Sequence, residues 1–520
     1  MSPNFIVTID YGKFPVLLSS VSQLQFTSSP LAVWAIFIVC VLFVLVVSEL
    51  VSKRFSIDVD ASRRTVHMLV GTLIFSARYV FSEPLYPLLT GLGFIAFNLV
   101  AMYAHQLPSI HATSRRTFGT VYFPLAFVIL IILFWERSPL ALQTGILLLT
   151  FPDPIAAIVG QRSKRPLYKL WQDTKTVPGT IALFLSAMLV FTLVALILEP
   201  GEIEHFPLSF KIYLIIMTGL VAVIAENLSR EGSDNLTLPI LPAIFIYFTI
   251  HMPIDRLPEL IFWSAGSMAI LFMALKLRAL KVSGFFSAWL MGVYIATVGS
   301  LLWLIPVMVF FISSSILTRL DMANSFESKQ YRKYDSGRRD WIQVIANGGV
   351  GLIIALIYGF WPDPRLYLVF LACFAAAAAD TWATEIGSWS THPPAMLTTF
   401  QPVKSGVSGG ITLLGTIGSA LGAFTIAISG SLLYDPFIGV TTIAIITLIG
   451  FSASLFDSLL GATVQVRFRL LDTGRISEKR PTAETYEIAS GWSWLDNNAV
   501  NLMATASAAL VGAALLLLAG

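Results

Sequence analysis

The chain alternates long apolar segments with short polar ones over most of its length. An apolar stretch of about 20 residues is long enough to cross a bilayer as a helix, and hydrophobic periodicity and breaker residues separate sixteen such stretches here. They lie near 31–51, 65–82, 85–104, 118–134, 139–160, 178–198, 208–226, 237–251, 259–275, 283–297, 300–318, 342–361, 366–388, 408–429, 437–462 and 499–519. The pattern therefore predicts an all-α, polytopic membrane protein with about sixteen transmembrane helices.

The positions of the Lys and Arg residues predict the orientation of these segments. Cytoplasmic loops of membrane proteins are enriched in Lys and Arg. When sixteen spans alternate in direction, 27 of the 33 Lys and Arg residues fall on one side and 6 on the other. We therefore expect sixteen spans with both chain termini outside the cytoplasm.

The composition narrows the classes of protein that remain. Hydrophobic residues make up 56% of the chain and charged residues 12%, whereas a soluble domain carries about 25% charged residues. A soluble globular enzyme and a disordered protein are therefore excluded. The net charge of +3 creates no field for a polyanion, so no nucleic acid is expected as a partner. Cys40 and Cys373 lie far apart in apolar runs and form no disulfide framework or metal-ligand spacing.

A pattern of small and acidic residues occurs twice, eight spans apart. The first copy is Asp153, Ala156 and Gly160, followed by the segment Lys-Thr-Val-Pro-Gly-Thr at 175–180. The second copy is Asp380, Ala383 and Gly387, followed by the segment Lys-Ser-Gly-Val-Ser-Gly-Gly at 404–410. The spacing i, i+3 and i+7 places each acidic residue and its two small partners on one stripe of a helix. Because eight is even, we expect two parallel eight-helix repeats, which divide the chain into 1–257 and 258–520.

The acidic residues of both copies are candidates for metal binding. A carboxylate at the end of a membrane span is unfavourable unless it is paired, hydrated or bound to a cation. Oxygen ligands of this kind suit Mg²⁺, and further Asp and Asn residues follow in each half. The expected metal ligands are Asp153, Asp234, Asp380, Glu385 and Asp457, and Asn235, Asn497 and Asn498 are expected to support the metal or a phosphate donor.

The basic residues and glycines after each copy are candidates for phosphate binding. Lys175 and Lys404 precede small residues where the next span is expected to begin, and free N–H groups at a helix N-terminus bind phosphate. The expected anion-binding residues are Gly179, Thr180, Ser408, Gly409 and Gly410. Each motif alone has a simpler interpretation as a cap, a close packing contact or a topology signal. Their recurrence in the same order favours two related phosphoryl-transfer sites.

Two further groups of polar residues lie at expected span ends. Arg64 and His67 lie where the second span begins, and they contact phosphate in one interpretation and sit at the membrane interface in the other. Arg338, Arg339, Gln343 and Asn347 lie on or near one face at the start of the twelfth span. A buried amide pair such as Gln343 and Asn347 needs hydrogen-bonding partners.

Both halves resemble known families through these motifs. Residues 49–251 resemble the phytol kinase and dolichol kinase family of CTP-dependent polyprenol kinases, through the segments 63–71, 118–124, 153–160, 175–180 and 226–239. Residues 265–520 resemble the phytyl-phosphate kinase family, through the segments 313–319, 343–348, 379–387, 404–412, 456–462 and 496–501.

The resemblance implies two successive phosphorylations of an isoprenoid alcohol such as phytol, first to the monophosphate and then to the diphosphate. It implies CTP or another nucleoside triphosphate as donor, with Mg²⁺, and products that feed the synthesis of tocopherol, quinones or chlorophyll. The expected partners are the lipid bilayer, the alcohol and its monophosphate. The expected location is a cell inner membrane or a photosynthetic membrane, with both sites on the cytoplasmic side.

Two other functions agree with the same residues. A cytidylyltransferase that makes a CDP-linked lipid would use the same donor but release pyrophosphate, whereas a kinase releases the nucleoside diphosphate. A transporter also fits parallel repeats with polar groups in the spans. Its essential charges would lie near the middle of the membrane, whereas these charges cluster at one expected interface.

Overall fold

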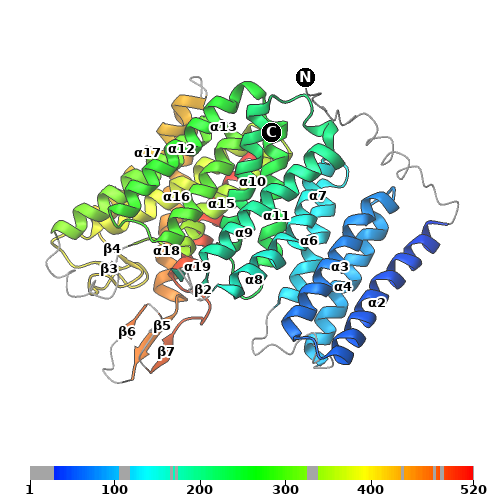
Figure 1. Cartoon of the computed structure of the whole chain (residues 1–520). Coiled ribbons are helices and arrows are strands. Elements are labelled where there is room, and N and C mark those ends of the chain that lie inside the picture. The colour runs from blue at the N-terminus through cyan, green and yellow to red at the C-terminus, as the bar shows by residue number, and fades with distance from the viewer. Residues whose placement is uncertain are drawn as a thin grey trace. The chain divides into compact units, whose positions relative to one another are not determined.

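The structure is a computed structural model, and it describes residues 29–104, 118–163, 168–169, 174–324, 338–434, 439–471, 476–478, 480 and 485–518. The chain divides into two compact units, Met1–Ile254 and Asp255–Gly520. This division lies three residues before the boundary expected at 257/258. Helices dominate both units (Figure 1).

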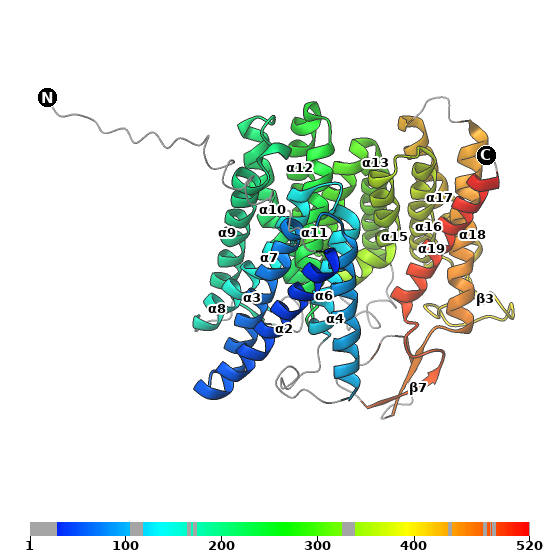
Figure 2. The same cartoon turned by 90° about the vertical axis from the view of Figure 1, so that its right-hand side faces the viewer.

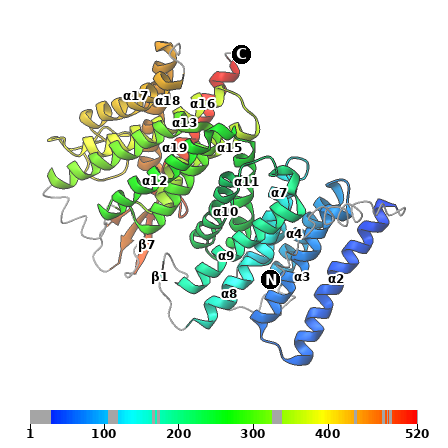
Figure 3. The same ribbon diagram turned by 45° about the horizontal axis from the view of Figure 1, so that its top comes forward.

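The first unit consists of helices with one short hairpin. Its helices are α2 (Pro30–Phe55), α3 (Val59–Val80), α4 (Leu85–Ala104), α6 (Gly119–Phe134), α7 (Pro139–Thr150), α8 (Pro152–Arg162), α9 (Val177–Leu193, continued as a π-helix over Val194–Leu198), a 3-10 turn at Pro200–Glu202, α10 (Leu208–Leu228) and α11 (Asp234–His251). Strands β1 (Tyr168–Lys169) and β2 (Thr174–Lys175) pair antiparallel between α8 and α9. Helix α2 packs on α3 at one edge of this unit (Figure 3) and leaves large apolar side chains exposed, as a lipid-facing helix does.

The second unit combines long helices with two small antiparallel sheets. After a 3-10 turn at Ile254–Arg256, its helices are α12 (Leu257–Lys276), α13 (Val282–Asn324), α15 (Trp341–Phe360), α16 (Arg365–Gly387), α17 (Leu413–Tyr434), α18 (Val440–Thr463) and α19 (Asn497–Leu518). Strand β3 (Ala395–Met396) pairs with β4 (Gly410–Ile411), and β5 (Arg467–Leu470) lies between β6 (Ile476–Ser477) and β7 (Tyr486–Ser490). Figures 1 and 2 both place these strands at one end of the unit's helices.

Twelve helices in the described residues are long and apolar enough to span a membrane. One of them, Val282–Leu320, contains a kink at Ser300, whose φ of 66° is not helical, and it covers two expected spans. The Glu259 carboxylate caps the second part by accepting a hydrogen bond from Leu301 N at 3.0 Å. The expected spans at 65–82, 118–134 and 237–251 are also helical, although they are not among the twelve. The protein is therefore a multi-pass membrane protein, while the count of sixteen stays a prediction. The orientation of the termini is also untested, and residues 1–28 and 519–520 lie outside the described residues.

The spans that carry Asp153 and Asp380 are the most buried of the twelve. Buried residues make up 56% of the apolar 18-residue stretch in Pro139–Arg162 and 67% of that in Arg365–Gly387, more than in any other of the twelve spans. Helix α7 contacts α3, α6 and α11, and α16 contacts α13, α15, α17, α18 and α19 (Figure 2). A run of alanines, 375–379, allows these neighbours to approach α16 closely. Asp380 therefore lies on the central helix of the second unit, and Asp153 lies just after α7, the central helix of the first.

The expected span 139–160 is broken in the structure. Helix α7 ends at Thr150 and α8 begins at Pro152, so Asp153 lies in the first turn of a new helix and not at the end of a continuous span. Pro152 and Pro154 have no backbone N–H to continue the hydrogen-bond ladder of α7. The break places the carboxylate at a helix N-terminus, where the helix dipole favours negative charge.

Glycines allow the acidic helix of each unit to touch the helix that follows it. A Cβ atom added to Gly179 would lie 3.0 Å from the carbonyl oxygen of Ala156 and 3.2 Å from Cα of Gly160. A Cβ atom added to Gly415 would lie 2.8 Å from the carbonyl oxygen of Ala383 and 3.2 Å from Cα of Gly387. The small residues of the repeated motif therefore bring α8 against α9 and α16 against α17.

We expect Gly415→Ala to destabilise the protein because its new methyl group would collide with the carbonyl group of Ala383. Overpacking of this kind costs about 1–3 kcal/mol, which a lowered thermal midpoint in detergent would report. Gly266→Ala is the matched control, since the nearest atom to its Cβ would be 4.0 Å away. An equal midpoint for the two variants would contradict this packing.

Candidate active site

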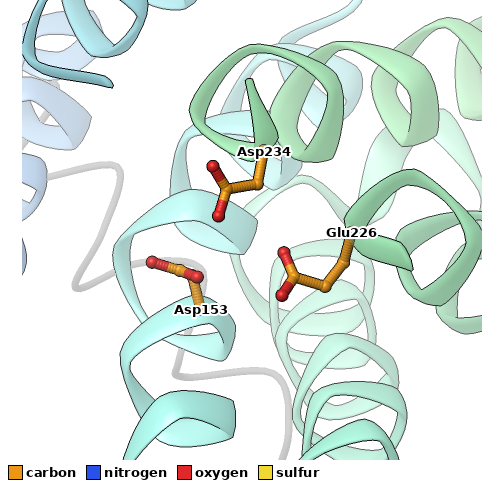
Figure 4. A group of neighbouring side chains, drawn as sticks. All are labelled: Asp153, Glu226 and Asp234. Atoms are coloured by element: carbon orange, nitrogen blue, oxygen red, sulfur yellow. The ribbon is translucent and has the colours of Figure 1, made fainter. Parts of the chain in front are cut away.

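Three carboxylates converge in the first unit (Figure 4). Asp153 comes from the first turn of α8, Glu226 from the last turn of α10 and Asp234 from the first turn of α11. One carboxylate oxygen from each lies within 4.8 Å of the other two, and all three residues are half-buried. This acidic trio is the one group of three His, Cys, Asp or Glu side chains with metal-binding spacing among the described residues.

The trio has a lysine beside it. Two ionised carboxylates 4.8 Å apart repel by about 3.5 kcal/mol at an effective dielectric constant of ~20. The Lys175 ammonium, at the end of β2, forms an ion pair with Glu226, and the exposed fractions of the two side chains are 26% and 13%. The charge of Arg63 also acts on Asp153. One ion pair leaves the negative charge of the trio incompletely balanced, so the cluster suits an additional cation.

The pKa of Lys175 shows how strongly this site attracts positive charge. Burial by itself would lower the pKa of the ammonium, but the Glu226 carboxylate and the charges of Asp234 and Asp153 raise it above its ordinary value. The folded protein therefore holds this proton more tightly than the unfolded chain does. The resulting stability is present at all pH values below the ordinary lysine pKa, and it is lost only when the solution becomes strongly alkaline.

A tight turn between α10 and α11 places Glu226 and Asp234 together. Glu231 and Gly232 have φ values of 54° and 88°, and Ser233 Oγ accepts a hydrogen bond from Arg230 N at 2.9 Å. The predicted donor ligand Asn235 is buried, and its Nδ2 atom donates to the carbonyl oxygen of Gly119 at 3.3 Å. In this structure the Asn235 side chain therefore forms a hydrogen bond between α11 and α6.

The predicted phosphate-binding residues of the first unit lie at the start of α9. Thr176 caps the helix, and its Oγ1 atom accepts a hydrogen bond from Gly179 N at 3.2 Å. The hydroxyl group of Thr180 donates to the carbonyl oxygen of Thr176 at 3.1 Å. Gly179 and Thr180 are therefore at the expected helix N-terminus, where they take part in capping and close packing.

The second predicted group, Arg64 and His67, is on α3. His67 Nε2 lies 2.9 Å from the carbonyl oxygen of Leu149, and its ring packs edge-on against Phe123 with centroids 4.8 Å apart. Arg64 is half-buried. It is the neighbouring Arg63 whose charge acts on Asp153. Arg63 is therefore the arginine of this pair that the structure places near the acidic trio.

In the second unit, Asp380 and Asp457 lie near each other. Asp380 is on α16 and Asp457 is on α18, and the charge of one acts on the other. The Asn501 amide on α19, in the orientation that satisfies its neighbours, donates to Asp457 Oδ2 at 3.2 Å and to the Asn497 carbonyl oxygen at 2.9 Å. The order of helices matches α8, α10 and α11 of the first unit, but an amide stands where the third carboxylate would be.

The predicted residues Asn497 and Asn498 begin α19. Asp496 precedes them, and its Oδ1 atom accepts a hydrogen bond from Ala499 N at 2.9 Å. Asn497 is exposed, and its backbone carbonyl is the group that meets Asn501. Asn501, one turn further into the helix, is the residue that contacts Asp457.

Among the described residues, Glu385 does not share metal-binding spacing with Asp380 and Asp457, so its expected role as a metal ligand stays a prediction. Within the described part of the second unit, no three acidic, His or Cys side chains share metal-binding spacing. Side chains five residues apart on an α-helix point in directions that differ by roughly 140° around the helix axis. Glu385 therefore leaves α16 in a different direction from Asp380. Glu385 accepts a hydrogen bond from Thr318 Oγ1 at 2.7 Å instead.

The prediction that Lys404 and the following glycines open the next helix is wrong. Lys404 is exposed, and α17 begins nine residues later, at Leu413. Gly410 belongs to β4. The segment that matches residues 176–180 in structure is 412–416, because Thr412 Oγ1 accepts a hydrogen bond from Gly415 N at 2.9 Å and Thr416 Oγ1 donates to the Thr412 carbonyl oxygen at 2.9 Å. Both segments read Thr-x-x-Gly-Thr, a signal that the Gly-Gly pair obscured.

Ser408 nevertheless binds an anionic group, which is a carboxylate of the same chain. Glu478 accepts hydrogen bonds from Ser408 N at 2.8 Å and from the Ser408 hydroxyl group. Gln465 Nε2 donates to Ser408 Oγ at 3.1 Å, and Arg467 Nη2 donates to the carbonyl oxygens of Ser408 and Gly461 at 3.2 Å each. A Cβ atom on Gly409 would lie 2.5 Å from that of Ala462. These contacts hold the loop against the last turn of α18.

Sequence reasoning missed two residues of these clusters, Glu226 and Asn501. Glu226 ends an apolar span eight residues before Asp234, and a carboxylate at such a position has the same need for a partner as Asp153. Asn501 lies inside a segment already singled out but four residues beyond the polar cluster at its start, one helical turn away.

Comparison with known proteins shows membrane-protein relatives. Residues 265–509 match the family described as "Integral membrane protein DUF92". The chain is 31% identical over 217 residues to an uncharacterized membrane protein of Methanocaldococcus jannaschii. The aligned region covers 41% of this chain and 87% of the relative. It is 30% identical over 274 residues to "Protein PGR" of Arabidopsis thaliana, a region that covers 47% of this chain and 92% of the relative. It is 26% identical over 208 residues to "Phytol kinase" of Synechocystis sp., a region that covers 39% of this chain and 85% of the relative. No solved structure matches the chain.

We expect Lys175→Met to destabilise the first unit because it leaves the acidic trio without its ammonium group. Removal of one partner of a buried ion pair costs about 3 kcal/mol or more, so the thermal midpoint in detergent should fall clearly at pH 8. The loss should be smaller at pH 5, because burial raises the pKa of the Asp234 carboxyl to about 6 and protonation then removes its negative charge.

Lys211→Met is the control for that variant. The Lys211 ammonium donates to the Glu204 carbonyl oxygen at an exposed site, so its loss should change stability by about 0.5 kcal/mol or less. Equal midpoints for the two variants at pH 8 would show that the ion pair is not needed. The same loss for Lys175→Met at both pH values would show that carboxylate charge does not cause the loss.

Proposed function

The chain belongs to the family of integral membrane proteins described as DUF92, and on this basis we propose that it is a membrane-bound kinase of isoprenoid alcohols. The first unit phosphorylates an alcohol such as phytol to the monophosphate, and the second converts the monophosphate to the diphosphate. CTP or another nucleoside triphosphate is the donor. The observation that carries the proposal is the acidic trio with Lys175 beside it.

The donor set of the trio fits Mg²⁺. Magnesium takes hard oxygen ligands, and in phosphoryl-transfer sites it is held by one or two carboxylates and the phosphates of the substrate. Asp153, Glu226 and Asp234 offer such oxygens within 4.8 Å of one another, and a divalent ion would balance charge that Lys175 leaves unbalanced. The bound metal would neutralise the negative charge of the donor phosphates.

The chemistry is a displacement at the terminal phosphorus of the donor. The substrate hydroxyl oxygen forms a bond to that phosphorus while the bond to the bridging oxygen breaks, and the nucleoside diphosphate leaves with the bonding electron pair. The proton of the hydroxyl group passes to a carboxylate of the trio. Lys175 and Arg63, whose charges act on the trio, would pair with donor phosphates. Positioning and charge neutralisation supply most of the rate in such reactions.

A lipid-soluble substrate agrees with the position of the site. Asp153, Glu226 and Asp234 all lie at the ends of helices in a membrane protein, so a polar head group can meet the donor at the interface while its hydrocarbon tail stays among the helices. The similarity to a phytol kinase of Synechocystis supports an isoprenoid alcohol as substrate. The distribution of Lys and Arg supports a cytoplasmic location for both sites, in a cell inner membrane or photosynthetic membrane.

The second unit is proposed to act with Asp380 and Asp457. These carboxylates lie on the central helix α16 and on α18, with Asn501 bonded to Asp457. Two carboxylates suffice to hold a magnesium ion that also binds phosphates. Fusion of two such units keeps a membrane-bound monophosphate near the site that consumes it, which raises its effective concentration.

Product analysis tests this proposal. Purified chain is given phytol and CTP, and lipid and nucleotide products are measured by mass spectrometry. We expect phytyl diphosphate and CDP from the natural sequence, monophosphate alone from Asp380→Asn, and no product from Asp153→Asn. Asp153→Asn should still convert supplied phytyl monophosphate, because Asp380 and Asp457 are intact. Each affected step should fall by at least about 100-fold, since a carboxylate that holds the metal or accepts the proton is lost.

Glu204→Gln is the control, because Glu204 is an exposed carboxylate of the first unit outside the trio. It should keep both steps. Loss of both steps in both Asp variants would contradict one site per unit. Release of pyrophosphate with CMP retained in the lipid would identify a cytidylyltransferase, and movement of the lipid without nucleotide consumption would identify a transporter.

A further inference from the structure

The second unit contains an apolar cavity with a polar stripe along one wall. The cavity, of about 70 Å³, lies between α12, α13 and α15. Its apolar lining includes Leu271, Met291, Val307 and Phe310. Ser267 of α12 is one polar residue of its lining, and Arg339, Gln343 and Asn347 are the other three. These three residues are spaced i, i+4 and i+8 at the start of α15, so they follow one face of the chain as it enters the helix.

Backbone hydrogen bonds fix the position of Arg339, which lines the cavity. Arg339 N donates to the Ala279 carbonyl oxygen at 3.0 Å, and the Arg339 carbonyl oxygen accepts from Lys281 N at 2.8 Å. Gly284 permits this approach, because a Cβ atom there would lie 2.3 Å from the Arg339 carbonyl oxygen. The next residue, Asp340, caps α15. Arg339 is therefore fixed between the start of α13 and the start of α15.

The surroundings of the Arg339 guanidinium group indicate that this site suits an anionic ligand. It lies 5.8 Å from the centre of the Phe310 ring, which lines the cavity. No ion pair joins it to a carboxylate within the described part of the chain. An arginine between helices needs hydrogen-bond acceptors for its donor groups. A phosphate, with several oxygens, fits its planar fork better than a single carbonyl group.

The amides extend the polar stripe into the cavity. Gln343 Oε1 accepts from Asp340 N at 3.1 Å, and Asn347 Nδ2 donates to the Gln343 carbonyl oxygen at 2.8 Å. These bonds leave the Gln343 amide N–H groups as donors toward the cavity within the described structure. The site therefore presents a guanidinium group and an amide donor, followed by apolar walls. That order matches a ligand with a phosphate head and a hydrocarbon chain.

Two helices that line the cavity, α13 and α15, pack against α16, the helix that carries Asp380. The charge of Glu385 acts on Arg339, and Glu385 is five residues from Asp380 on α16, about 7.5 Å along the helix. A head group on Arg339 would therefore lie between helices that contact α16. The terminal oxygen of a bound monophosphate is the nucleophile that the second reaction requires.

The dimensions of the cavity favour a single branched chain. A volume of about 70 Å³ holds only the part of the chain next to the head group. Gly292 and Gly348 add no side chains to the wall, and the Met291 and Met308 side chains can adjust to a branched ligand. The remainder of the chain would leave past Ile312, which lines the cavity and is 41% exposed.

We propose that this cavity is the binding site for the isoprenyl monophosphate of the second reaction, with Arg339 and Gln343 on the phosphate and the first isoprene units between α12, α13 and α15. The inference rests on the proposed function, because it names the substrate site of the second unit. Arg339 acts as a specificity residue that separates the monophosphate from the uncharged alcohol.

The test is photolabelling without nucleotide. The purified full chain in phosphatidylcholine nanodiscs is incubated with a prenyl monophosphate that carries a diazirine on its first isoprene unit, and labelled peptides are identified by mass spectrometry. We expect label on α12, α13 and α15. Unlabelled farnesyl monophosphate should remove it, whereas farnesol, phosphatidic acid and inorganic phosphate at the same concentration should not.

Matched variants separate this site from general membrane binding. Arg339→Gln should reduce labelling at least tenfold, since a charge-assisted bond to phosphate is lost, and Arg339→Lys should recover part of it. Arg338→Gln removes the same charge one residue away, outside the cavity lining, and should keep labelling within twofold. Gly292→Leu should reduce labelling by filling the cavity, since its Cβ atom meets only Leu304, at 3.6 Å.

Three results would overturn the inference: label outside these helices, equal competition by phosphatidic acid, or equal labelling of Arg339→Gln and Arg338→Gln. None of the measurements needs phosphoryl transfer. Labelling as expected in a protein that forms no phosphorylated product would remove the proposed function and leave the binding site, whereas turnover without specific labelling would do the reverse.

Discussion

Charge balance around three converging carboxylates is the constraint on which the first unit depends. Asp153, Glu226 and Asp234 come from three helices and place oxygens within 4.8 Å of one another, in half-buried positions. Lys175 pairs with Glu226, but a single ammonium group does not neutralise three carboxylates. Burial of such a cluster is unfavourable unless a further cation is present when it is charged. The fold maintains this arrangement by breaking α7 from α8 and by turning sharply between α10 and α11.

Close helix packing is the second constraint, and each unit shows it separately. Gly179 against Ala156 and Gly415 against Ala383 bring the acidic helix of each unit into contact with the next helix. The threonine that caps that next helix is part of a Thr-x-x-Gly-Thr segment in both units. The residues before these segments differ. Lys175 precedes the first segment, whereas Ile411 occupies the corresponding position in the second.

The sequence predicted the membrane class, the helical positions and the acidic residues because these depend on local pattern. Long apolar runs fix helices in a bilayer, and carboxylates inside them are conspicuous. It failed where the answer depends on loop length. The loop between α16 and α17 is long enough to separate Lys404 from the helix start. Glu226 and Asn501 enter the clusters through tertiary contacts between helices, which spacing along one helix does not reveal.

If the acidic trio holds a divalent cation, as we propose, it should bind Mn²⁺, which takes the same hard oxygen ligands as Mg²⁺ and can be followed by electron paramagnetic resonance. The purified chain is titrated without nucleotide. We expect a tight site from which Mg²⁺ displaces Mn²⁺. Asp380→Asn should retain this site, and both Asp153→Asn and Asp234→Asn should lose it. Tight binding that persists in Asp153→Asn and Asp234→Asn would contradict the proposal.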